Sequence, residues 1–68
     1  MTYTAAIRQS GDWWIGWIEE VPGVNAQERT KQELLIALSE CLGEAIEMNR
    51  ENARAAVGDG FEEVAIEA

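Results

Sequence analysis

Asp12-Trp13-Trp14-Ile15-Gly16-Trp17-Ile18-Glu19-Glu20-Val21-Pro22-Gly23-Val24 is the stretch that decides the fold of this 68-residue chain. It holds all three tryptophans and the only proline. The aromatic and β-branched run from Trp13 to Ile18 predicts a β-strand. Pro22 fixes its own φ near -65°, and Gly23 tolerates the positive φ that the next position of a type II turn requires. The stretch therefore predicts a strand, a sharp reversal and the start of another strand.

Two further strands are predicted on either side of this one. Residues 2–9 alternate between two sets of side chains, which is the period of a strand. Ser10-Gly11-Asp12 is a turn cluster that can close a hairpin. After the proline turn, residues 24–29 form a short and more polar third strand. The first half of the chain is therefore expected to be a three-stranded antiparallel meander.

A single amphipathic helix follows the meander. Thr30 and Glu33 match the capping box S/T-x-x-E, in which Thr30 is the N-cap of the helix. Apolar residues then recur at spacings of four and three, which places them on one face: Leu34, Leu38, Cys41, Ala45 and Met48. Alanines extend the helix to Val57, and Gly58 fits the position just past its end. We expect the helix to lie on one face of the sheet, with Cys41 and Met48 in the core.

The last predicted element is a C-terminal strand over residues 61–68. Because a helix precedes it, this strand can lie parallel to an earlier one. The predicted architecture is a single α+β domain over residues 1–68 in the order β-β-β-α-β.

The two faces of the central strand pose a question that the sequence leaves open. Trp13, Ile15 and Trp17 share one face, and Trp14, Gly16 and Ile18 share the other. Only one face can meet the helix. We take the face with three large side chains as the helix face, which leaves Trp14 and Ile18 for a partner or a second copy. In the alternative, Trp14 lies flat and half-exposed against a neighbouring strand or against the chain's own C-terminal segment.

Composition restricts the class of function. The net charge of -8, from 13 acidic and 5 basic residues, disfavours nucleic acid as a partner of this chain alone and favours a basic protein. The chain has no histidine, so it lacks the commonest general base and zinc ligand. One cysteine, Cys41, allows no internal disulfide and indicates a reducing compartment. We therefore expect a cytoplasmic binding protein with no catalytic residues, metal or cofactor, and with no membrane association.

The order of the predicted elements, together with the turn and cap residues between them, resembles the HicB family of antitoxins from bacterial type II toxin–antitoxin systems. Four pieces carry the resemblance: residues 11–18, the turn of residues 20–24, Ala26 in the next strand, and Thr30 through Glu33 opening the helix. Together the similarity covers about residues 2–67. It implies a partial ribonuclease-H-like fold. Because the chain ends directly after the last strand, it is similar to short members without a C-terminal DNA-binding segment.

The resemblance also implies a function. A HicB-like domain binds and neutralises a small basic HicA-type toxin that cleaves mRNA, and it forms dimers or larger homo-oligomers. Glu19 and Glu20 then become candidates for contact with the basic toxin, although a solvated turn explains them equally simply. The alternative is an orphan homo-oligomerisation domain with the same fold and no toxin partner.

Overall fold

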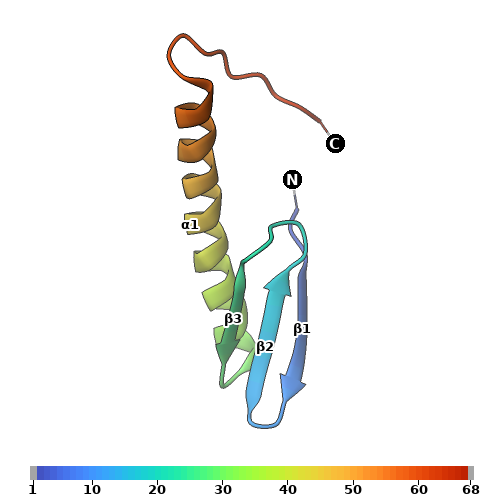
Figure 1. The fold of residues 1–68 in the computed structure, drawn as a ribbon. Helices are drawn as coiled ribbons and strands as arrows, with labels where there is room; N and C mark the ends of the chain where they lie inside the picture. The colour runs from blue at the N-terminus through green and yellow to red at the C-terminus, as the bar shows by residue number, and fades with distance from the viewer. Residues whose placement is uncertain (1, 68) are drawn as a thin grey trace.

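A three-stranded antiparallel sheet followed by one long helix makes up the fold (Figure 1). The computed structural model describes residues 2–67. Strands β1 (Ala5–Ser10), β2 (Trp13–Ile18) and β3 (Asn25–Glu28) lie in the order β1-β2-β3. Helix α1 (Lys31–Val57) packs on β2 and β3. The predicted α+β class and the antiparallel meander are confirmed.

Glycine backbone conformations close both strand connections. Gly11 has φ 60° in the two-residue loop between Ser10 and Trp13, which are paired across the hairpin. Gly23 has φ 87°, and the Val24 amide donates to the Val21 carbonyl at 3.4 Å, as a type II turn requires. The predicted turn at Pro22 and Gly23 is therefore confirmed.

Helix α1 begins and ends as its sequence predicts. The Thr30 hydroxyl accepts a hydrogen bond from the Glu33 amide at 3.1 Å and donates one to the Glu33 carboxylate at 2.9 Å. At the other end, Gly58 has φ 83° and its amide donates to the Arg54 carbonyl at 3.1 Å. Thr30 is therefore the N-cap, and the helix extends over 27 residues.

The hydrophobic core lies between α1 and the sheet, and it is small. Within residues 2–67 its buried apolar side chains are Ile18, Val24, Leu34 and Leu38, of which Leu34 and Leu38 are fully buried. Half-buried residues, including Tyr3 and Leu42, pack around them. The rest of α1 rises beyond the end of the sheet (Figure 1).

The predicted C-terminal strand is not part of the sheet. Residues 61–67 form no β-ladder, and Ala68 lies outside the described residues. The segment turns back at the top of α1 and runs towards the sheet without reaching it (Figure 1). Residues 61–67 have the residue pattern of a strand, but the 27-residue helix ends well beyond the sheet and so keeps them away from it.

Candidate interaction surfaces

The assignment of the two faces of β2 is wrong, because the structure reverses it. Ile18 is 7% exposed and belongs to the core, and Trp14 is half-buried against that core. Gly16 lies between them on the same face, with no side chain. A Cβ atom placed there would stand 3.1 Å from Leu38 Cδ1 of the helix. The helix therefore approaches the sheet over Gly16, and Trp14 and Ile18 belong to the interior of the domain.

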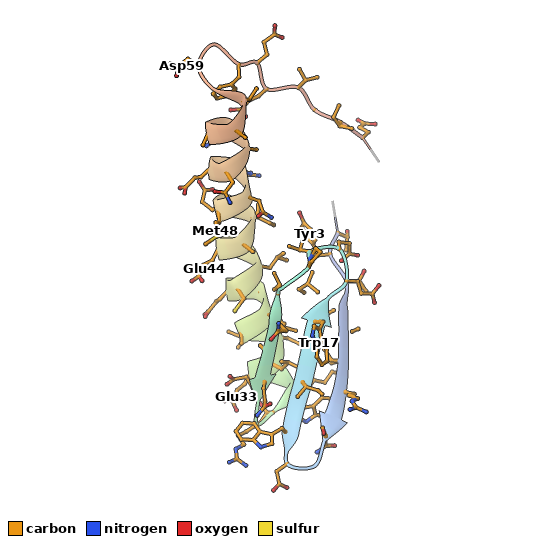
Figure 2. The ribbon with its side chains drawn as sticks, in the orientation of Figure 1. Tyr3, Trp17, Glu33, Glu44, Met48 and Asp59 are labelled. Carbon is orange, nitrogen blue, oxygen red and sulfur yellow. The ribbon has the colours of Figure 1, made fainter. Side chains whose placement is uncertain are left out.

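The opposite side of the sheet is its open surface, which we name the tryptophan face. It consists of the β2 residues on this side and their paired neighbours on β1 and β3: Ala6, Arg8, Ser10, Trp13, Ile15, Trp17, Asn25 and Gln27. Trp13 is 36% exposed and Trp17 is 50% exposed, and Ile15 lies half-buried between them. Trp17 is labelled on β2 in Figure 2.

The chemistry of the tryptophan face suits binding of another surface. Its strand residues are apolar, neutral polar or basic, with no carboxylate among them. At its edge, the Arg29 guanidinium lies 4.1 Å from the centre of the Trp13 ring, within the range of a cation–π interaction. Exposed tryptophan beside arginine is the composition that dominates binding energy at protein interfaces.

Glu19 and Glu20 lie at the end of β2, where both are exposed and tied to the chain before β1. The Glu19 amide donates to the Thr4 carbonyl at 2.9 Å. The Glu20 carboxylate accepts from the Thr4 amide at 2.7 Å, and this bond lowers the pKa of Glu20 below its ordinary value. Glu20 therefore has a local structural role that the sequence analysis missed, although its carboxylate stays open to solvent.

Helix α1 carries an exposed line of carboxylates, which we name the acidic ridge. Its members follow helical spacing and are all exposed: Glu33, Glu40, Glu44, Glu47 and Glu51. Glu44 is labelled on α1 in Figure 2. The ridge gives the helix a strongly negative outer surface, while the strand residues of the tryptophan face are neutral or basic.

Two helix residues predicted to be in the core are exposed. Cys41 is a free and exposed thiol, and Met48 is 61% exposed. The buried stripe of the helix consists of Leu34, Leu38 and the half-buried Leu42. These residues are four apart, so they lie on the same side of the helix, and this side faces the sheet. Met48 lies where α1 leaves the sheet behind, so no strand is there to cover it (Figure 2).

No protein-family model, curated protein or solved structure matches this chain. In the part of the chain that the structure describes, no three carboxylate or thiol groups gather in a way that could hold a metal ion. Within the same residues, no helix is long and apolar enough to cross a bilayer.

One signal in the sequence could have found the tryptophan face. A glycine in a strand interior often marks a close approach by another backbone. Gly16 shares its face with Trp14 and Ile18, so the face with the glycine is the one that a helix can approach closely. Choosing the helix face by the number of large side chains gives the wrong face, because three large side chains beneath the helix would keep it away from the sheet.

Proposed function

We propose that this chain is a protein-binding module of the antitoxin type. It would neutralise a small basic mRNA-cleaving toxin, of the kind that the HicB resemblance implies, by masking the toxin's surface. The observation that supports this best is the open tryptophan face, where Trp17 is half exposed in a domain whose core is small. Leaving so large an apolar side chain in water forfeits the free energy of burying it. A partner that covers the face would recover that free energy.

Charge would assist the encounter with a basic partner. The net charge of -8 attracts a positively charged protein, and complementary charge raises association rates and selects partners more than it adds affinity. The exposed acidic ridge on α1 and the carboxylates of Glu19 and Glu20 supply this field. Occlusion needs no chemistry, which agrees with a chain that contains no histidine.

The fold that the resemblance implies is part of the same proposal. A ribonuclease-H-like half would place a helix on a meander of three strands and then add a fourth strand from the C-terminus. The order β1-β2-β3-α1 supports the first part of this architecture.

A second candidate function is homo-oligomerisation without a toxin. One observation favours it: the radius of gyration is 15.1 Å, whereas a compact domain of this length has about 11 Å. An elongated chain with a small core gains more from self-association than a compact one does.

The test is an RNA-cleavage assay with a small basic ribonuclease toxin of the HicA type, encoded beside this chain. Increasing amounts of the chain should abolish cleavage at a saturating ratio. Trp17→Ala should weaken inhibition by at least tenfold, because a central aromatic contributes about 2 kcal/mol or more. Ile36→Ala is the matched control, since Ile36 on α1 is 53% exposed, close to the 50% of Trp17, but lies off the tryptophan face.

Two outcomes would count against the proposal. If cleavage is unchanged at a saturating ratio, the antitoxin function is wrong. If Ile36→Ala weakens inhibition as much as Trp17→Ala does, the tryptophan face is not the binding surface. A chain that self-associates but leaves the toxin active would support the second candidate.

A further inference from the structure

The described chain exposes far more surface than a compact monomer of its size. Its accessible area is 5494 Å² at a mass of 7.5 kDa, whereas the scaling law for folded monomers gives about 4,250 Å². The excess is roughly 1,200 Å² per chain. A standard protein–protein interface buries about 800 Å² per partner. The surplus is therefore enough to form a stable contact with another molecule.

This surplus is concentrated where α1 passes beyond the sheet. Ala45 is the last helix residue that packs against the core. Val57 ends the helix twelve residues later, a rise of about 18 Å. Beyond it, residues 61–67 are all exposed, including Phe61 at 41%, Val64 at 72% and Ile66 at 87%. We name residues 61–67 the C-terminal segment.

The C-terminal segment does not lie along β1 of its own chain. Returning about 18 Å takes five or six extended residues at about 3.3 Å each. Only residues 58–60 separate the helix from the segment, and two of them, Gly58 and Gly60, have positive φ values of 83° and 76°. Most of the segment is therefore used in travelling back. The ion pair that joins it to its own helix, Arg54 Nε to Glu63 Oε1 at 3.6 Å, is exposed, and such pairs contribute little to stability. Residues 61–64 also line a shallow hollow with Arg50, Ala53, Arg54 and Val57 of the helix, and Phe61 stays 41% exposed there.

Strand β1 is the matching open surface. It is an edge of the sheet, and α1 packs on β2 and β3. An uncovered edge presents unpaired amide and carbonyl groups that can pair with another strand. Its residues, Ala5–Ser10, include no proline and no carboxylate, and their only charge is Arg8. The C-terminal segment carries three carboxylates and no basic residue.

We propose that the C-terminal segment of one copy adds to the β1 edge of a second copy as its fourth strand, and that the exchange is reciprocal. The seven residues 61–67 match the six residues of β1 in length. Val64 and Ile66 share one face of the added strand with Glu62. Glu63 and Glu67 share the other face with Phe61 and Ala65, and on that face the carboxylates can meet Arg8 of the second copy. The exchange closes a two-fold dimer. It goes beyond the proposed function and requires no toxin.

A proline substitution tests the strand addition. The dimer should have a solution mass of twice 7.5 kDa by light scattering coupled to size exclusion. The double variant Val64→Pro/Ala65→Pro removes two consecutive amides, one of which must face β1, and so blocks ladder pairing; this variant should shift to the mass of one chain. Ala65→Ser keeps the amide and should remain a dimer. Both variants should keep the helical circular-dichroism signal, because the segment makes no part of the sheet or of α1.

Disulfide trapping distinguishes exchange from a dimer formed in another way. In a Cys41→Ser background, one chain carries Ala6→Cys and another carries Ala65→Cys. Mixed under oxidising conditions, they should form a covalent dimer, whereas pairing Ala65→Cys with Ser39→Cys on the exposed side of α1 should not. A dimer mass that survives the double variant Val64→Pro/Ala65→Pro would overturn the proposal. So would a chain with both Ala6→Cys and Ala65→Cys that closes within itself, or a wild-type chain that is monomeric at millimolar concentration.

Discussion

Gly16→Ala tests the close approach of α1 to the sheet, on which the assignment of the tryptophan face depends. A Cβ atom at position 16 would lie 2.8 Å from Ile7 Cγ2, 3.1 Å from Leu38 Cδ1 and 3.3 Å from the Ala6 carbonyl oxygen. Ordinary carbon–carbon contacts lie near 3.5–4.0 Å. The Ile7 Cγ2 methyl group sits on a β-branched carbon and moves only if χ1 changes, and Leu38 is buried, at 1% exposed. The Ala6 oxygen belongs to the strand paired with β2 and cannot move without disturbing the ladder.

The expected loss follows from two opposing effects. Overpacking a well-packed core costs about 1–3 kcal/mol. Replacing glycine by alanine also restricts the unfolded chain, which returns about 0.4–1 kcal/mol. The net prediction is a decrease of about 1–2 kcal/mol in the free energy of unfolding. With a urea m-value of about 1 kcal/mol/M for so small a domain, the midpoint should fall by about 1–2 M.

Gly43→Ala provides a control with the same chemical change and the opposite expected sign. A Cβ atom at Gly43 would meet nothing within 4 Å, on the exposed side of α1. Glycine in a helix interior costs about 0.5–1 kcal/mol relative to alanine, so this variant should gain that amount. Both variants should be unfolded in urea at one fixed protein concentration, because self-association would make the midpoint concentration-dependent. If Gly16→Ala proves as stable as wild type, the helix does not pack over Gly16 and our assignment of the faces fails.

Three further predictions concern the cap of helix α1, the loss of stability at acid pH and the thiol of Cys41. Thr30→Ala should lower the free energy of unfolding by about 1 kcal/mol through loss of the N-cap, and Thr30→Ser, measured alongside in urea, should retain most of it. The lowered pKa of Glu20 means that its bond to Thr4 stabilises the fold fully above the ordinary value of 4.5. That contribution is lost as pH falls below this value through the folded-state pKa. Glu20→Gln should therefore flatten the dependence of thermal stability on pH below 4.5, and an unchanged acid limb would contradict this role. The exposed thiol of Cys41 should react with a thiol reagent in the folded protein as fast as in urea, and Cys41→Ser should change stability by less than about 0.5 kcal/mol; a protected thiol would contradict the placement of Cys41.

The sequence alone determined the features that depend on neighbouring residues. The strand of residues 13–18, the turn at Pro22 and Gly23, the Thr30 cap and the end of α1 at Gly58 all appear as predicted. Each depends on backbone conformations and hydrogen bonds that span a few residues. Residue chemistry therefore decided them before any tertiary contact formed.

Tertiary structure decided which residues are left for binding. Both faces of β2 are apolar, so the alternation of apolar residues does not distinguish the face of Trp14 and Ile18, which turn inwards, from that of Trp17, which stays exposed. Gly16 marks the inward face, but only the packed structure shows that the helix uses it. The choice was made by the missing side chain at Gly16, which lets α1 approach one face closely. The fate of residues 61–67 was likewise decided in space. Their pattern is that of a strand, but the length of α1 beyond the sheet carries them away from the β1 edge of their own sheet.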